Sequence, residues 1–533
     1  MWKRPGQANH GAWAVGWKVG PVLAAVAVWA SACGEDPAPM EPMEPGPDAD
    51  TLETAKSDPE HAVLDQFYFS TNGDDWTNND GWDECCDLGS RYGVEVDSAG
   101  RVVGIDLRDN NLEGRIGPGL GDLEYLRYLF LSDNELQGSI PTDLGDLTRL
   151  TRLGLGDNEL TGSIPTELGD LVRLTHLGLQ NNELTGSIPT EFGDLARLTQ
   201  LGLQNNELTG SIPTEFGDLT RLTRLGLHNN YLTGSIPSEL GNLARLKHLG
   251  VHNNDLTGEI PSELGNLDSL THLGLHNNDL TGSIPGELGD IDSLTHLGLS
   301  ANALTGSIPG ELGDLAGLKT LFLQHNALTG PIPPELGNLD SLTHLWLSHN
   351  SLSGGVPGEL GNMGSLTKLL LGGNGELTGP LPAHLANTPL EMLGYNDTGL
   401  CVPDDPDFRA WLDSIPVHQG TGIDCSGGDI ERSILEAFYR ATGGPEWTDA
   451  TNWLSGEDLG DWHGVDVDTA GRVVELGLAN NNLAGELPPE LGGLDSLVVL
   501  DLSDNSLTGE IPSELGDIRN LTHLHLYTNE LTG

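Results

Sequence analysis

Two series of histidines, each with a spacing of 24 residues, carry the side chains best suited to chemistry in this chain. The first series is His248, His272 and His296, and the second is His228, His252 and His276. Imidazoles at such a spacing could donate or accept hydrogen bonds to a ligand, or share a Zn²⁺ or Cu²⁺ ion. Because imidazole titrates near pH 6.5, we also expect mild acid to place a row of positive charges along each series.

An apolar group follows these histidines at the same spacing. Phe322, Trp346 and Leu370 stand where each earlier copy of the repeat, from residue 154 to residue 298, has glycine. Aromatic side chains bury large areas at little entropic cost and dominate recognition surfaces. The histidines beside this group are His325, His344 and His349. We therefore expect a bare glycine aisle between polar and imidazole walls, closed by an apolar patch and suited to a glycan or an extended peptide.

The sequence leaves three interpretations of this surface open. It could recognise a macromolecular ligand through the histidines and aromatic rings. It could bind a metal, although zinc sites usually need four convergent ligands and these columns lie on an open sheet, so we predict neither a metal nor another cofactor. It could also be the by-product of recent copying of one repeat, without selection for any ligand.

The spacing of 24 is that of an internal repeat between residues 105 and 382, with the template L-x-x-L-x-L-x-x-N-x-L-T-G-x-I-P-x-x-L-G-x-L-x-x. Its asparagine recurs twelve times in register, from Asn110 to Asn374. One unit cannot bury its own leucines, so the copies must stack as a solenoid. Side chains alternate along a strand, so template positions 4 and 6 face the core and positions 3, 5 and 7 face outward. We expect the asparagine to be buried and to satisfy backbone groups of neighbouring repeats.

The L-x-x-L-x-L-x-x-N core identifies leucine-rich repeats, and the L-T-G-x-I-P segment resembles the plant-type subclass. That subclass occurs in plant receptor ectodomains, polygalacturonase-inhibiting proteins and many bacterial surface proteins, and the resemblance covers most of the chain. It implies an α/β-type right-handed superhelix with parallel strands on the concave face. The convex side should be mostly irregular, 3-10 or polyproline-like, and helical caps should cover the N-terminal ends.

The first 58 residues predict export and attachment to a membrane. Residues 1–33 read as a signal peptide whose Ala30-Ser31-Ala32-Cys33 end resembles a bacterial lipobox, which implies lipidation of Cys33. Residues 34–58 are acidic and rich in proline, as expected of an extended tether. These features favour a lipid-anchored protein of the bacterial cell envelope.

Two segments have the composition of N-terminal caps, at residues 59–104 and 429–472. Their helical and tryptophan patterns match with a constant offset of 371 residues, so one cap-and-repeat module is used twice. The first cap contains the adjacent pair Cys85 and Cys86, which could form a strained vicinal bridge, contact another chain or stay reduced. The second cap has Gly456 and Glu457 there, so the cap fold does not require a thiol at these positions.

The repeats of the first array extend over residues 105–400, and residues 401–428 resemble the C-terminal cap of plant-type and bacterial repeat proteins. This resemblance implies a disulfide between Cys401 and Cys425, followed by a hinge. The second array covers residues 473–533 and stops within a repeat. We expect a truncated gene model or a partner that covers the open end, because exposed apolar ends are a liability for solenoids.

Charge and motifs exclude several classes of function. The chain has 79 acidic and 24 basic residues, a formal charge of -55, which argues against nucleic-acid binding. It contains no G-x-S-x-G, H-E-x-x-H, G-x-x-x-x-G-K-[ST] or G-x-G-x-x-G motif, so we predict no enzymatic activity. The prediction is a non-enzymatic cell-surface protein that binds a protein or polysaccharide on its concave face. The alternatives are an inhibitor of secreted cell-wall hydrolases and a structural or stress-related surface coat.

Overall fold

The computed structural model describes residues 59–82, 87–425 and 427–532. The predicted signal peptide and tether, the lipidation residue Cys33 and the pair Cys85 and Cys86 lie outside the described residues. Among the residues that are described, no helix is both long and apolar enough to cross a membrane.

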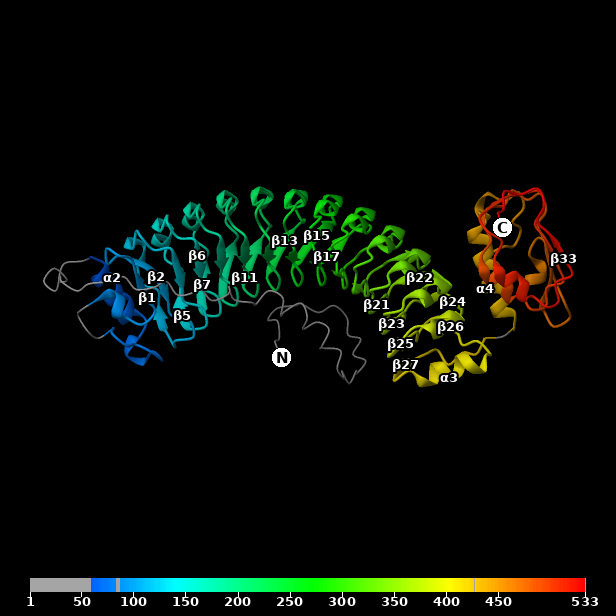
Figure 1. Cartoon of the computed structure of the whole chain (residues 1–533), viewed down its shortest axis with the longest axis horizontal. Coiled ribbons are helices and arrows are strands. Elements are labelled where there is room, and N and C mark those ends of the chain that lie inside the picture. Colours follow the sequence, from blue (N-terminus) through cyan, green and yellow to red (C-terminus); the bar gives the residue numbers. More distant parts are fainter. Residues whose placement is uncertain (1–58, 83–86, 426, 533) are drawn as a thin grey trace, which may run out of the picture. The chain divides into compact units, whose positions relative to one another are not determined.

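The main feature of the first array is one long sheet. An antiparallel pair, β1 and β2, begins it, and each later strand joins the preceding one in parallel. Paired residues are 24 apart in sequence as far as β25 and 25 apart between β25 and β27. In Figure 1, strands such as β21, β23 and β25 lie on the inner side of the curved array. The strands are β1 (Val94–Val96), β2 (Val102–Asp106), β4 (Tyr128–Phe130), β6 (Arg152–Gly154), β8 (His176–Gly178), β10 (Gln200–Gly202), β12 (Arg224–Gly226), β14 (His248–Gly250), β16 (His272–Gly274), β18 (His296–Gly298), β19 (Thr320–Phe322), β21 (His344–Trp346), β23 (Lys368–Leu370), β25 (Met392–Gly394) and β27 (Val417–Gln419).

The L-T-G-x-I-P part of each repeat forms two further parallel sheets. Except for β26, each of these strands begins one to three residues after the conserved asparagine, so the chain leaves the main sheet by a short turn. The eight-stranded sheet contains β3 (Glu113–Arg115), β5 (Glu135–Gly138), β7 (Glu159–Ser163), β9 (Glu183–Ser187), β11 (Glu207–Gly210), β13 (Tyr231–Gly234), β15 (Asp255–Glu259) and β17 (Asp279–Thr281). The four-stranded sheet contains β20 (Thr329–Gly330), β22 (Ser351–Gly354), β24 (Glu376–Pro380) and β26 (Gly399–Cys401).

Short 3-10 helices complete each repeat, as the template's proline predicts. Pro165, for example, has φ -64° and ψ 134° immediately before η5, and its ring fixes that φ. The series is η3 (Leu120–Asp122), η4 (Thr142–Asp146), η5 (Thr166–Asp170), η6 (Thr190–Asp194), η7 (Thr214–Asp218), η8 (Ser238–Asn242), η9 (Ser262–Asn266), η10 (Gly286–Asp290), η11 (Gly310–Asp314), η12 (Pro334–Asn338), η13 (Gly358–Asn362) and η14 (Ala383–Asn387).

The conserved asparagine holds neighbouring repeats together. The Nδ2 group of Asn206 donates to the carbonyl of Leu179 in the preceding repeat (3.0 Å) and to that of Leu203 in its own (3.1 Å). Its Oδ1 accepts from the backbone N–H of Leu184 (3.1 Å). The same bonds recur along the array, and they satisfy backbone groups that would otherwise be buried without partners. This confirms the role predicted for the asparagine column.

Both ends of the first array are capped. At the N-terminal end, α2 (Pro59–Ser70), η1 (Gly73–Asp75) and η2 (Leu88–Ser90) place Leu64, Phe67, Trp76 and Trp82 in the core of the array. At the C-terminal end, α3 (Pro406–Ser414) contributes Phe408 and Leu412 to the same core. A disulfide joins Cys401 of β26 to Cys425, with an S–S distance of 2.06 Å.

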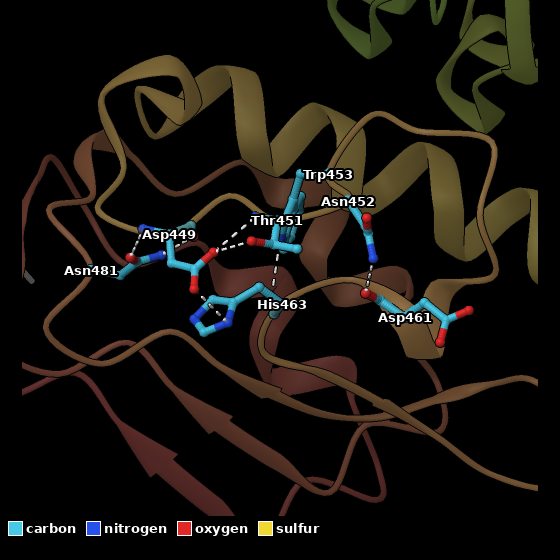
Figure 2. Close-up of polar contacts among 7 residues, drawn as sticks. All are labelled: Asp449, Thr451, Asn452, Trp453, Asp461, His463 and Asn481. Atoms are coloured by element: carbon cyan, nitrogen blue, oxygen red, sulfur yellow. Dashed lines mark hydrogen bonds and ion pairs between the residues drawn. The ribbon is translucent and has the colours of Figure 1, made fainter.

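The second module repeats this construction with its own apolar core. Its cap contains a polar cluster around Asp449 and His463, drawn in Figure 2. The helices are α4 (Gly427–Ala441), η15 (Gly444–Glu446), η16 (Leu459–Asp461), η17 (Pro489–Gly493) and η18 (Ser513–Asp517). The main sheet contains β28 (Val465–Val467), β29 (Val473–Gly477), β31 (Val499–Asp501) and β33 (His523–His525), and a second sheet pairs β30 (Ala484–Glu486) with β32 (Ser506–Thr508).

Candidate ligand-binding face

The first histidine series lies along the main sheet. His248, His272 and His296 are the first residues of β14, β16 and β18, and they are direct register partners. Their rings stand 4.6 Å and 4.2 Å apart, centroid to centroid. Parallel pairing of the strands therefore turns a sequence spacing of 24 into a continuous column of imidazoles.

The second series forms another column, two residues after the end of each strand. The rings of His228, His252 and His276 stack at 4.4 Å and 4.2 Å, almost parallel. His228 and His252 are only 3% and 5% exposed. Stacked rings do not direct their nitrogen atoms toward a common point, and among the described residues no group of three or more His, Cys, Asp or Glu side chains could hold a metal ion.

The glycine column is covered, not bare as predicted. A Cβ atom added at Gly226 would meet Oε1 of Gln204 at 2.6 Å, and one added at Gly250 would meet Nδ1 of His228 at 3.1 Å. The long side chains that follow each strand thus fold back over the glycines. These glycines give the imidazole and amide groups room to lie flat on the sheet.

The rings of the aromatic patch are closely packed. Phe322 and Trp346 pack against each other with ring centroids 4.5 Å apart, and each is only 8% exposed. They remain outside the leucine core of the array, because they occupy the outward-facing third position of β19 and β21. His344 meets Phe322 edge-on at 6.4 Å, and Leu370 is partly exposed on the next strand. Phe322 and Trp346 thus form an apolar patch outside the leucine core, with little of either ring exposed.

His325 and His349 belong to a third group, because they follow the strands in the turn that leaves the sheet. Both have left-handed backbone angles, φ 58° and 56°, and their rings stack at 4.5 Å. In earlier repeats this turn position holds asparagines such as Asn253 and Asn277, whose side chains hydrogen-bond to each other (2.6 Å). The predicted site residues thus form two stacked columns, one aromatic cluster and one separate pair.

Burial lowers the pH at which these histidines take up protons. Desolvation lowers the pKa of His228, His248, His276 and His296 to about 4, and it lowers that of His252 well below 6.5. Nearby cations and other imidazoles add to this effect at His248 and His296. Because a buried imidazolium loses hydration, the columns stay neutral in mild acid. The expectation of a charged row near pH 6.5 was wrong.

Buried polar atoms without hydrogen-bond partners are concentrated on this same face. Within the described part of the chain, at least six such atoms lie between β10 and β21. They are Oε1 of Gln204, Nδ1 of His228, Nδ1 of His248, Oγ1 of Thr320, Oε1 of Gln324 and Nε1 of Trp346. A buried donor or acceptor without a partner costs about 1–3 kcal/mol, so native proteins contain few of them. We call this stretch of the concave sheet, residues 204–346, the central face.

Part of this group does not stand out in the sequence. Gln204, Thr320 and Gln324 belong to variable polar columns of the repeat, whose residue types alone indicate no particular role. The signal that could have identified the glutamines is their position two residues after a glycine or aromatic column. Only the packing shows that Gln204 folds over the glycine column.

Models of leucine-rich repeats match much of the chain. The leucine-rich repeat region model matches residues 164–285, and a second leucine rich repeat model matches residues 268–328. Single repeats match at residues 125–147, 149–171, 341–363, 472–494 and 496–518. No curated protein matched the chain.

Among solved structures, plant receptor ectodomains are similar to this chain. The leucine-rich repeat ectodomain of the Arabidopsis thaliana membrane receptor kinase GASSHO1/SCHENGEN3, in complex with CASPARIAN STRIP INTEGRITY FACTOR 2, has a TM-score of 0.65 and 34% identity, covering 88% of this chain and 56% of that one. The plant peptide hormone receptor RGFR1, in complex with RGF2, has a TM-score of 0.55 and 31% identity, covering 80% and 66%.

A third match is the Arabidopsis receptor kinase HAESA, in complex with the peptide hormone IDA and the co-receptor SERK1. Its TM-score is 0.59 at 27% identity, covering 89% of this chain and 82% of that one. This chain spans less than two thirds of the first two ectodomains. The repeat matches, the long parallel sheet and these similarities show that the chain is a leucine-rich repeat solenoid with the fold of plant receptor ectodomains.

Proposed function

We propose that this chain is a non-enzymatic binding protein whose central face holds an extended peptide or a segment of another protein. The six unpartnered polar atoms of that face carry the proposal. Their cost is offset if a ligand supplies the missing partners, since bonds that only a ligand can make favour the bound state. Three similar ectodomains were solved in complex with CASPARIAN STRIP INTEGRITY FACTOR 2, with RGF2 as the partner of a peptide hormone receptor, and with the peptide hormone IDA, which supports this ligand class.

The chemistry of the unpartnered atoms suits a polypeptide main chain. Oε1 of Gln204 and Oε1 of Gln324 can only accept, whereas Nε1 of Trp346 can only donate. An extended peptide presents both a donor and an acceptor at each residue. All of these atoms are covered by neighbouring side chains, so the ligand must displace side chains of the face as it docks.

The experiment isolates one of these atoms. A random dodecapeptide phage library is selected on the immobilised full chain, and the affinities of the selected peptides are measured for the Trp346→Phe variant. Phenylalanine keeps a ring on β21 but removes the indole N–H, so we expect roughly tenfold weaker binding. Trp411→Phe, in the C-terminal cap, is the control and should bind like the unsubstituted chain.

Two results would overturn the proposal. One is a selection that enriches no peptide above a blank surface. The other is a set of enriched peptides whose binding is unaffected by both substitutions, since that would place the ligand away from the central face. Binding only to a glycan array would instead favour a polysaccharide ligand.

We also propose that the chain is exported and held at the cell envelope by a lipid on Cys33, in front of two cap-and-repeat modules. The Ala30-Ser31-Ala32-Cys33 sequence supports this proposal, as does the extracellular nature of the similar receptor ectodomains. Mass spectrometry of the mature N-terminus tests it. We expect a diacylated N-terminal Cys33, and an unmodified thiol there would end the proposal.

A further inference from the structure

The concave sheet lacks the acidic residues that are frequent in the rest of the chain. In each repeat, five positions lie on the concave face or at its border: the residue before the strand, its first and third residues, and the second and third residues after it. Over the nine strands from β8 to β23 none of these positions holds Asp or Glu, although the chain contains 79 acidic residues. Acidic residues return at either end, with Asp157 after β6 and Glu391 before β25.

Cations occupy this acid-free stretch. Lys247 and Lys319 are exposed and stand directly before β14 and β19. No acidic side chain lies within ion-pair distance of either lysine in the described part of the chain. Arg224 begins β12, and Arg224 and Lys319 are close enough to His272 to add to the lowering of its pKa. The cations therefore border the same imidazole columns that line the central face.

The spacing of the two lysines suits an extended ligand. Lys247 and Lys319 are three strands apart, about 14 Å at the usual separation of strands in a sheet. About four residues of extended chain span that distance. A ligand that crosses the strands of the central face could thus reach both ammonium groups with two carboxylates on one side of its chain.

The acid-free stretch also decides where an anion can bind. Elsewhere the repeats carry a glutamate in nearly every 3-10 helix, such as Glu215, Glu239 and Glu263. At physiological ionic strength charges are screened over about 8 Å, so a bound segment responds mainly to side chains of the surface it touches. An anionic segment would be repelled by the acidic sides and accepted by this face, whereas a cationic partner would have no reason to select it.

We infer that the segment bound by the central face is acidic, with carboxylates placed to reach Lys247 and Lys319. This inference rests on the proposed function and specifies the class of its ligand. The ligand class is the peptide of the proposed function, whose main-chain amides can donate to the buried acceptors of Gln204 and Gln324.

The test compares two pairs of charge reversals of equal size. A random dodecapeptide phage library is selected on the full chain, on Lys247→Glu/Lys319→Glu, and on Arg173→Glu/Arg221→Glu. Arg173 and Arg221 are also exposed, but they lie outside the five concave positions. The control therefore changes the net charge as much as the lysine variant does, without changing the charge of the concave face. We expect Asp and Glu to be enriched on the unsubstituted chain and on the arginine control, and not on the lysine variant.

The selected acidic peptides should bind the lysine variant roughly tenfold more weakly than the other two proteins, with binding that weakens as salt is added. Enriched peptides without an excess of Asp and Glu would overturn this inference and leave the proposed function intact. No enrichment on any protein would overturn both. Binding of polygalacturonate without any peptide enrichment would indicate that Lys247 and Lys319 bind an anionic polysaccharide.

Discussion

The two modules of the chain share their inner construction and differ in what they expose. In the first cap, Oε2 of Glu60 accepts from the backbone N–H of Val102 (2.8 Å), and in the second, Oε2 of Glu431 accepts from that of Val473 at the same distance. The indole N–H of Trp76 donates to the carbonyl of Thr71, and Trp447 repeats this bond with Thr442. All these pairs obey the offset of 371, so the cap depends on buried groups that satisfy backbone atoms.

The exposed part of the cap has changed. Asn78 of the first cap is replaced by Asp449 in the second, and Asp449 accepts from the N–H and hydroxyl of Thr451 and lies 3.4 Å from Nδ1 of His463 (Figure 2). The histidines of the two modules also differ, because the two columns of the first array are stacked and buried or half-buried, whereas the exposed His463 and the partly exposed His525 each lie beside a carboxylate. The inside of the module thus constrains its residues far more than its surface does.

Acid should destabilise the first module more than the second, and we expect this difference to be the largest of those predicted. A pKa lowered from 6.5 to about 4 at His228 means that the unfolded chain binds a proton more readily, so stability present at pH 7 is lost between about pH 6.5 and pH 4 and changes little below that. The loss from His228 alone is about 3 kcal/mol at most. Hydrogen exchange of β10 to β18 should accelerate over this range more than exchange of β29 and β31.

The His228→Gln variant sharpens this prediction. Glutamine occupies the same position in neighbouring repeats, at Gln180 and Gln204, so the column should tolerate it. The variant should lose less stability in acid than the unsubstituted chain, while His418→Gln at an exposed site should behave like the unsubstituted chain. Equal acid sensitivity of all three proteins would contradict the assignment to the buried column.

Removing the asparagine that joins cap to array should affect both modules equally. Asn110 accepts from the N–H of Asn78 (2.7 Å) and donates to its carbonyl (2.9 Å), and Asn481 makes the same two bonds to Asp449. Asn110→Ala and Asn481→Ala should each cost about 2–3 kcal/mol, measured by hydrogen exchange in the affected module. Asp122→Ala, at an exposed site, should cost little, and unequal losses in the two modules would break the equivalence of the caps.

The buried carboxylates give a slightly smaller test of the same equivalence. Glu60→Ala and Glu431→Ala should each destabilise their own cap by about 1.5–3 kcal/mol, because the N–H of Val102 or Val473 is left without its acceptor. Glutamine at either position keeps an acceptor oxygen and should recover most of the loss. Exchange protection of those two amides is the measurement, and a loss confined to one cap would count against a shared construction.

Substitution of exposed residues of the two caps should have the smallest effect on stability. Hydrogen bonds from Thr451 lower the pKa of Asp449, so its contribution is present above the ordinary carboxyl pKa and is lost as the pH falls through the lowered value. Asp449→Asn should remove this acid dependence from the second cap, and Asn78→Asp should not introduce it into the first, where Asp80 replaces the threonine. Unfolding curves of each variant between pH 2 and pH 5 decide the outcome.

The sequence predicted the backbone far better than the surface. The leucine spacing and the asparagine column determine the parallel stack because each acts on its nearest repeat, where the register is fixed. The packing of His228 over Gly250 and of Phe322 against Trp346 depends on which rotamer fills the space between strands. That choice, and the burial and pKa changes that follow from it, cannot be obtained from a column of residue types.

The asparagine bonds have a consequence for how such a chain can change over generations. The side chain of Asn206 bonds only to its own repeat and to the preceding one, and the side chains of Asn230 and Asn254 do the same. Every seam between repeats is therefore chemically equivalent to the next. A duplication or deletion of one whole 24-residue unit recreates the seam that it interrupts, so recombination can lengthen or shorten the solenoid without inventing a new contact.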